Sequence, residues 1–191
     1  MFSNFIMKQL KEAVRQAISE HNWYCALAGA LILPDICSSL DKPEMMTKVK
    51  ERYVGWYNSY VIENYTGIAG SFNEEEYVFD ESKKIIFLSG EDCYALRCAY
   101  LHNGLDEITK QRARESLNKF RFVTPSESGE QSKHLQKTIT FYDDKREVLQ
   151  LEVDKFCEDI CSGVDKWEAN VETVSSIQNK LGELLTIYEG Q

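Results

Sequence analysis

The sequence predicts a mainly α fold, a helical bundle of about five or six helices with a small β-hairpin insertion. Apolar residues recur at helical spacing along most of the chain, whereas two short stretches near residues 120 and 140 combine β-branched and aromatic residues as strands do. The length of 191 residues suits one domain with a substantial core. No internal repeat or low-complexity tract divides it, so we expect residues 1–191 to form a single domain.

Three helices are expected in the N-terminal third. The first, Asn4 to His21, carries one apolar stripe at helical spacing. The second, Trp23 to Leu33, is apolar on nearly every side and should lie in the middle of the bundle. Pro34-Asp35 is expected to interrupt it, because proline cannot donate the next backbone hydrogen bond. The third is expected from Pro43 to Asn64, with a stripe that is typical of a core: Met46, Val49, Tyr53, Trp56 and Tyr60.

The middle of the chain mixes loops with short strands. Residues 65–82 contain glycines and an acidic run, and we expect a loop there, followed by a short strand at Lys84–Leu88. The segment Ile108–Leu117 is a candidate for a short helix. The stretches Lys119–Thr124 and Lys137–Tyr142 are rich in aromatic and β-branched residues, with a proline and a polar loop between them, which predicts two strands of one hairpin.

Two helices are expected at the C-terminal end, one from about Val153 and a last one from Val171 to Tyr188. The six cysteines form no Cys-x-x-Cys pair, and we expect free thiols. Cys157 and Cys161 lie four apart and could share a metal ion, but no second ligand pair accompanies them. We interpret them as buried small apolar residues and expect neither a metal site nor a cofactor.

Charge and hydropathy narrow the function classes. The net charge of −9 argues against broad sequence-independent binding of nucleic acid, although an enzyme could still touch one or two phosphates. Met1–Leu10 lacks the pattern of a signal peptide, and the longest apolar run, Cys25 to Leu33, is too short to cross a bilayer. We therefore expect a cytoplasmic protein that does not enter a membrane.

One predicted helix carries residues suited to chemistry. It is expected over Glu91 to His102, with a capping box at Ser89-x-x-Asp92 before it and Asn103-Gly104 after it. Arg97 and His102 lie on this helix, five positions apart. Five positions turn the side chain by about 140°, so the two residues do not share one face, but the arginine is long enough to swing toward the histidine. An imidazole serves as proton acceptor or donor near neutrality, and a guanidinium grips two phosphate oxygens at once.

The stretch from Ala95 to Gly104, Ala-Leu-Arg-Cys-Ala-Tyr-Leu-His-Asn-Gly, resembles the signature of the HEPN superfamily. In that superfamily an arginine is followed four to six residues later by a histidine near a helix end. The fuller pattern from Leu88 resembles a group of uncharacterised bacterial and phage proteins. The resemblance implies a bundle of four or five helices and a homodimer in which two such helices form one RNA-cleaving cleft. Members often carry Asn, Asp or His directly after the arginine, and here this position is Cys98.

Basic residues follow the motif. Lys110, Arg112 and Arg114 belong to a stretch, residues 105–125, in which positive charges exceed negative ones by two. Such an island could guide an RNA backbone, or it could be the solvated face of a helix.

The pair of Arg97 and His102 also has a structural interpretation, since a histidine at a helix C-terminus is favoured by the helix dipole and Arg97 could pair with an acid such as Glu91 or Asp92.

Two functions remain open from the sequence. The first is a metal-independent endoribonuclease of HEPN type, in the toxin or phage-defence class, which acts as a homodimer and leaves 2′,3′-cyclic phosphate ends. Arg97 would hold the phosphate and His102 would move protons. The alternative is a non-catalytic HEPN-like binding module in a protein complex, with an antitoxin or another protein as partner. The acidic surface and Cys98 favour the second function, and the Leu-Arg and Leu-His-x-Gly context favours the first.

Overall fold

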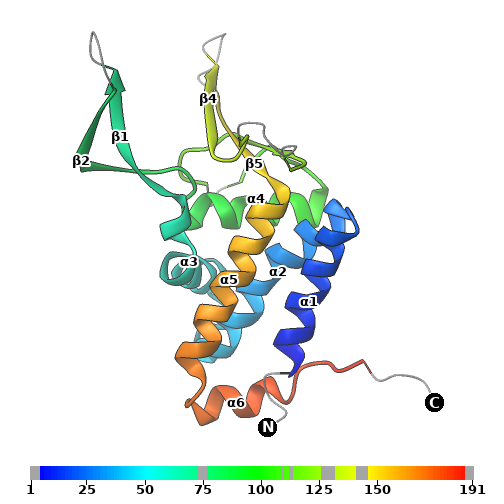
Figure 1. Cartoon of the computed structure of the whole chain (residues 1–191). Coiled ribbons are helices and arrows are strands. Elements are labelled where there is room, and N and C mark those ends of the chain that lie inside the picture. The colour runs from blue at the N-terminus through cyan, green and yellow to red at the C-terminus, as the bar shows by residue number, and fades with distance from the viewer. Residues whose placement is uncertain are drawn as a thin grey trace.

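The computed structural model describes residues 5–72, 77–108, 110–111, 114–125, 132–140 and 146–187. These residues form a mainly α fold, as predicted, with helices α1 (Phe5–Ser19), α2 (Trp23–Asp41), α3 (Val49–Tyr60), α4 (Gly90–Asn103), α5 (Val153–Val171) and α6 (Ser175–Leu181). α1, α2, α3 and α5 pack side by side, while α4 lies across one end of the bundle and α6 at the other (Figure 1). The fold therefore places the predicted Arg–His helix at one end of the bundle.

α2 is the central helix of the bundle and extends further than the sequence predicted. It contacts α1, α3, α4, α5 and α6. The expected interruption at Pro34 is wrong, because the helix continues through it to Asp41 and Pro34 is buried. A proline inside a helix costs about 3 kcal/mol. Burial of apolar side chains on several sides of α2, including Leu31, Leu33 and Leu40, offsets this cost.

The expected third helix is divided into three pieces. Pro43–Met45 forms a 3-10 turn, α3 covers Val49–Tyr60, and a second 3-10 turn covers Ile62–Tyr65. Most of the predicted stripe packs inward as expected, with Tyr53 and Trp56 buried in the core. Met46 instead lies in the connection before α3 and is 79% exposed.

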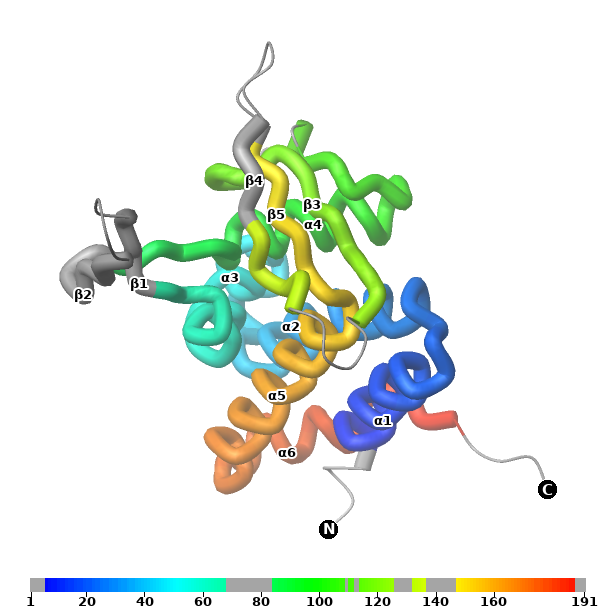
Figure 2. The backbone as a smooth tube through the Cα atoms, turned by 45° about the horizontal axis from the view of Figure 1, so that its top comes forward, coloured from blue at the N-terminus to red at the C-terminus, as the bar shows by residue number. Residues whose placement is uncertain are grey.

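The β structure differs from the predicted hairpin. Residues 65–82 were expected as a loop, but most of an antiparallel pair of strands, β1 (Thr66–Phe72) and β2 (Tyr77–Ile86), lies there. The end of β2 coincides with the first part of the strand expected from Lys84. β3 (Lys119–Val123) and β4 (Gln136–Thr140) were expected to pair with each other. They flank β5 (Arg146–Glu152) instead, with β3 parallel and β4 antiparallel to it. β5 then runs directly into α5 (Figure 2).

Two expected helices also change. No helix occurs in the described part of Ile108–Leu117, which consists of turns and bends and is flanked by an isolated bridge between Glu107 and Lys119. The expected last helix from Val171 to Tyr188 is wrong in extent. α5, which begins at Val153 as predicted, ends at Val171, and α6 occupies only Ser175–Leu181. Gly182 follows α6, and the described residues after it, up to 187, are turn and coil.

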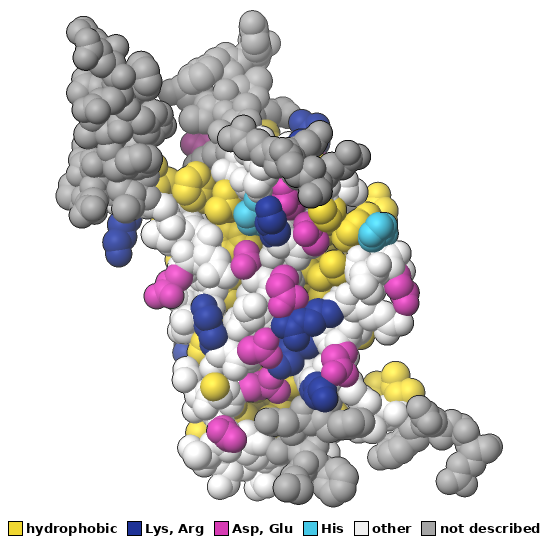
Figure 3. Space-filling model, in the orientation of Figure 1, with side chains coloured by type: hydrophobic (Ala, Val, Ile, Leu, Met, Phe, Trp, Pro, Cys, Tyr) yellow, Lys and Arg dark blue, Asp and Glu magenta, His cyan; other side chains and the backbone are white. Residues whose placement is uncertain are grey.

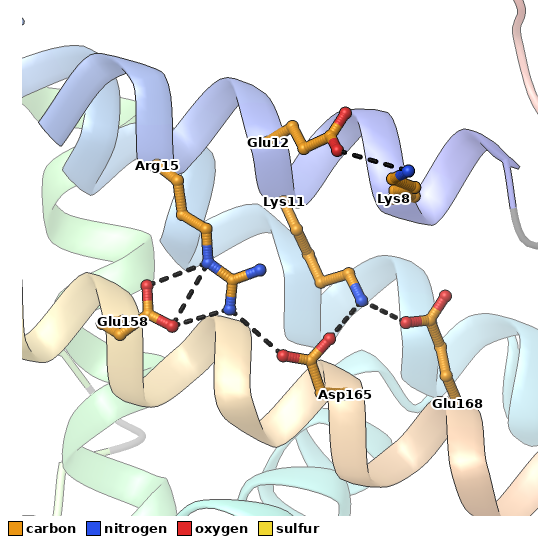
Figure 4. A network of polar contacts seen from close by, with 7 residues as sticks. All are labelled: Lys8, Lys11, Glu12, Arg15, Glu158, Asp165 and Glu168. Carbon is orange, nitrogen blue, oxygen red and sulfur yellow. Dashed lines mark hydrogen bonds and ion pairs between the residues drawn. The ribbon is translucent and has the colours of Figure 1, made fainter. Parts of the chain in front are cut away.

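Charged side chains line the contact between α1 and α5 (Figure 3). Arg15 of α1 binds Glu158 and Asp165 of α5, with Nη2–O distances of 2.6 and 3.1 Å. Lys11 binds both Asp165 and Glu168 (Figure 4). This α1–α5 ion network explains why the charged face of the first helix turns toward another helix.

The cysteines are free thiols, as predicted, and Cys157 and Cys161 are buried. Burial raises the pKa of both thiols, that of Cys161 to about 12. Both therefore stay protonated at neutral pH, which fits the interpretation as small apolar residues better than that of thiolate ligands. Among the side chains that the structure describes, no three His, Cys, Asp or Glu residues converge in the manner of a metal site.

Candidate functional site

α4 begins and ends where its capping residues predict. The Ser89 hydroxyl accepts a hydrogen bond from the backbone N–H of Asp92 at 3.1 Å, which starts the helix. Gly104 ends it with φ of 67°, a left-handed conformation that glycine adopts without a steric cost, and donates to the carbonyls of Ala99 and Tyr100. The predicted span, Glu91 to His102, is thus confirmed within a residue at each end.

Arg97 and His102 meet on the surface of this helix. Arg97 Nη1 lies 3.1 Å from His102 Nε2, so the long arginine side chain reaches toward the C-terminal end of the helix. A guanidinium only donates hydrogen bonds, and the contact therefore makes Nε2 the acceptor. His102 is exposed, whereas only 18% of the Arg97 side chain is accessible. The pair thus combines a reachable imidazole with a guanidinium that is held in place.

Asp35 of α2 holds the arginine. Its Oδ2 accepts from Arg97 Nη2 at 2.8 Å, and its Oδ1 lies 2.7 Å from Nη2 of a second arginine, Arg52 of α3. Arg52 Nη1 also donates to the Asp35 backbone carbonyl at 2.7 Å and to Ser38 Oγ at 3.0 Å. One carboxylate therefore joins α2, α3 and α4 at this end of the bundle. Arg97 thus pairs with an acid, as the structural interpretation allowed, but the acid is Asp35 and not Glu91 or Asp92.

The charges of this cluster do not cancel. Two guanidinium groups share one carboxylate, which leaves a local surplus of positive charge on the side that His102 occupies. Burial by itself would lower the pKa of Arg97, but Asp35 and the neighbouring groups more than offset this, so the pKa is raised and the group stays charged. Burial raises the pKa of nearby Tyr94 to about 12, so that phenol is neutral. The cluster suits a bound anion.

The basic island is only partly available to a ligand. Lys110 is exposed. Arg114 donates through Nη1 to the Leu117 carbonyl at 3.2 Å and so braces its own loop, while Arg112 lies outside the described residues. Lys119 pairs with Asp106 at 3.1 Å. Of the two predicted RNA-binding residues that the structure describes, Lys110 is exposed to solvent and Arg114 is partly buried.

Asp92 has a role that the sequence did not indicate. It is 1% exposed, and its carboxylate accepts from the backbone N–H groups of Glu115, Ser116 and Leu117 at 2.7, 3.1 and 3.2 Å. These bonds hold the loop before β3 against the first turn of α4. The expected reciprocal bond of a capping box is thus replaced by a long-range anchor, which also explains why this loop is not a helix.

Asp35 and Arg52 are the site residues that sequence reasoning missed. Asp35 was interpreted only as part of a helix break. A signal was present, because Asp35 and Asp41 are the two charged residues of α2, and a carboxylate inside an apolar helix needs a cationic partner. The sequence did not specify which of the arginines would supply it.

α2 has the length and composition of a helix that could cross a membrane. About half of the apolar window is buried inside the bundle, and the same test is passed by the core helix of a soluble protein. Comparison of the chain with protein-family models, with curated proteins and with solved structures found no match.

Proposed function

We propose that the protein is a cytoplasmic, metal-independent endoribonuclease of HEPN type, in the toxin or phage-defence class. The observation that carries the proposal is the contact between Arg97 and His102, 3.1 Å apart at the exposed end of α4. It brings together the two groups that attack of a ribose 2′-hydroxyl on the adjacent phosphate requires. One accepts a proton near neutral pH, and the other bears a fixed positive charge.

Each residue has a distinct role in this reaction. The Nε2 of His102, unprotonated in the present contact, takes the proton of the 2′-hydroxyl as that oxygen attacks phosphorus. Arg97 leaves this contact and binds the non-bridging phosphate oxygens, while Asp35 keeps the guanidinium near the surface. The bond to the 5′-oxygen breaks, and this oxygen takes up a proton. The products end in a 2′,3′-cyclic phosphate and a 5′-hydroxyl.

The proposed working unit is a homodimer with the two copies of α4 facing each other. One chain offers a single histidine at the site, so it supplies the proton acceptor for the 2′-hydroxyl but no second group to protonate the leaving oxygen. A second copy of His102 provides that donor. The dimer also brings the positive surplus of both arginine clusters to one cleft, which strengthens attraction for the phosphate.

A cleavage assay tests the proposal. Wild type, His102→Ala, Arg97→Ala and Arg97→Lys are incubated with total RNA in the presence of a chelator, and product ends are analysed for the cyclic phosphate. Wild type is expected to cleave, and both alanine variants to lose activity. Arg97→Lys should recover little, since an ammonium cannot form the bidentate contact. His21→Ala, which removes another exposed histidine, serves as the matched control and should cleave as wild type does.

The structure also offers an observation that favours the alternative, a binding module within a protein complex. Both Nη atoms of Arg97 are engaged, one by Asp35 and one by His102, as in a purely structural cluster. The position after the arginine is Cys98, where active members of the HEPN superfamily often carry Asn, Asp or His. Under this alternative wild type leaves RNA intact, and Arg97→Ala weakens binding of a partner protein such as an antitoxin.

A further inference from the structure

β1 and β2 form an arm that projects from the helical bundle (Figure 1). Among the strands that the structure describes, these two pair only with each other, so each has one edge without a neighbouring strand. A two-stranded hairpin is marginally stable in water by itself, and small stable sheets usually have three or more strands. An open edge is also a template on which another chain can add a strand. The arm is therefore a place where a partner would stabilise the fold.

The order of residues along β2 is self-complementary. The strand reads Tyr-Val-Phe-Asp-Glu-Ser-Lys-Lys-Ile-Ile, with two acids before Ser82 and two lysines after it. When β2 is aligned antiparallel with a second copy of itself, centred on Ser82, each acid lies opposite a lysine. The opposed residues are Asp80 with Lys84 and Glu81 with Lys83. Opposite charges that face each other across two strands stabilise a sheet, whereas like charges destabilise it. Every charged residue of β2 thus meets its opposite in a second copy.

Apolar residues flank the charges in the same alignment. Val78 lies opposite Ile86, and Phe79 lies opposite Ile85. Pairs of β-branched and aromatic residues across two strands add to the stability of a sheet. In the single chain Ile86 is 48% exposed and Ile85 is 39% exposed. Both isoleucines therefore carry apolar surface that a second copy of β2 would remove from water.

β1 does not offer β2 these pairs. It contains no charged residue, and in the register of the hairpin Asp80 lies opposite Ala69 and Lys84 opposite Ile68. Residues 81–83 have no partner in β1, because the register shifts between Ile68 and Ala69. The regular segments on either side of this shift are the ones that a second copy would pair. Charges on an edge strand ordinarily discourage pairing with other chains, but the order found in β2 admits its own copy.

We propose that two copies of the chain associate through the open edges of β2, which pair antiparallel about a two-fold axis at Ser82. The product is a four-stranded antiparallel sheet with the two copies of β2 in the middle and the two copies of β1 outside. The same residues contribute from both chains, as in other two-fold contacts. The contact is separate from the proposed α4 contact and does not depend on ribonuclease activity. One short strand from each chain makes a small interface, so we expect Kd of about 10 to 100 μM.

Charge reversal tests the proposal in the whole chain, with sedimentation over a range of concentrations as the measurement. Asp80→Lys sets two lysines opposite each other at both ends of the contact, and Lys84→Asp sets two acids there. Each single variant should raise Kd about tenfold or more. An equimolar mixture of the two variants should associate as wild type does, because every pair in the mixed contact again has opposite charges. The double variant, with both substitutions in one chain, should also recover association.

Lys166→Asp is the matched control, since it reverses the same charge at an exposed position of α5. It should leave Kd unchanged. Circular dichroism of each variant establishes that the fold is retained. The proposed α4 contact is unaltered in all of these proteins and so does not affect the comparison. Equal association of wild type and both single variants would overturn the proposal. So would a loss of association that neither the mixture nor the double variant recovers.

Discussion

Asp35 Oδ2 lies 2.8 Å from Arg97 Nη2, and this contact joins the centre of α2 to the helix that carries His102. The carboxylate follows a proline inside an apolar helix, where an unpaired charge would be costly. It is stable there because two arginines from two other helices meet it. The same contact that stabilises the bundle therefore orients the guanidinium of the proposed site.

Asp35→Asn is predicted to destabilise the protein by about 3 kcal/mol, because it leaves two partly buried guanidinium groups without their shared anion. Chemical unfolding at neutral pH measures the change. Asp41→Asn alters the same side-chain type at the end of the same helix and should cost under about 0.5 kcal/mol. Equal effects of the two substitutions would mean that the cluster contributes little to stability.

Asp92→Asn should also cost about 2 to 3 kcal/mol. The carboxylate is buried and accepts three backbone N–H groups from the loop before β3, and an amide presents only one acceptor oxygen to them. Hydrogen exchange should show faster exchange at Glu115, Ser116 and Leu117 in the variant. Glu91→Gln, at the neighbouring position, is the control. Unchanged exchange at these three amides would show that the anchor is not needed.

Local signals predicted α4 well, whereas contacts between distant segments were not predictable. Ser89 and Gly104 act within one turn of the helix, and so both ends of α4 could be located from the sequence. Pro34 also gives a local signal, but burial of α2 on several sides outweighs it.

The order of the strands depends on contacts rather than on propensity. The stretches around Phe120 and Ile139 were correctly expected as strands, but each pairs with β5, a segment whose apolar alternation was not recognised. The candidate site shows the same division. Arg97 and His102 share one helix and were found, while Asp35 and Arg52 reach the site from other helices.

His134 makes a pH-sensitive contact beside the sheet. Its Nδ1 accepts from the Glu152 backbone N–H at 3.1 Å, and its Nε2 lies 4.0 Å from Asp159 Oδ2. Tyr65 and Asn64 donate to that carboxylate at 3.0 and 2.8 Å. Burial lowers the pKa of His134 from its ordinary 6.5, although Asp159 acts in the opposite direction. The folded state therefore prefers the neutral ring.

This preference predicts the direction of the pH dependence. His134 contributes its full share to stability above about pH 6.5, the ordinary pKa of histidine in the unfolded chain. This contribution is lost as pH falls toward the lowered pKa of the folded state, because the unfolded chain binds the proton first. His134→Gln should therefore lose less stability than wild type between pH 7.5 and 5.5. Asp159, whose pKa burial raises from 3.8, acts in the opposite sense at lower pH. Urea unfolding at both pH values measures this, and an equal loss in both proteins would contradict it.

Lys11→Met is predicted to cost about 2 to 3 kcal/mol. The lysine side chain is 8% exposed and binds both Asp165 and Glu168, so its removal leaves Glu168 partly buried without this cation (Figure 4). Lys8→Met, on the same helix, removes a lysine that is 68% exposed and pairs with the exposed Glu12, and should change stability by under about 0.5 kcal/mol. Thermal unfolding of both variants gives the comparison, and similar melting temperatures would contradict the prediction.

The proposed cleft between two copies of α4 predicts that inactive subunits inhibit active ones. Light scattering at micromolar concentration should report a dimer, and an excess of His102→Ala protein added to wild type should lower RNA cleavage more than dilution does. The reason is that a mixed dimer holds one His102, which supplies the proton acceptor or the proton donor but not both.

Dilution with a Met46→Ala protein, altered at an exposed side chain before α3, controls for exchange of subunits and should leave cleavage per wild-type chain unchanged. Two results would show that one chain carries the whole site. One is a strict monomer that still cleaves RNA, and the other is a mixture in which subunits have exchanged but activity follows the wild-type fraction alone. His102 would then act with a donor from its own chain or from water, and the facing arrangement of the two α4 helices would have to be abandoned.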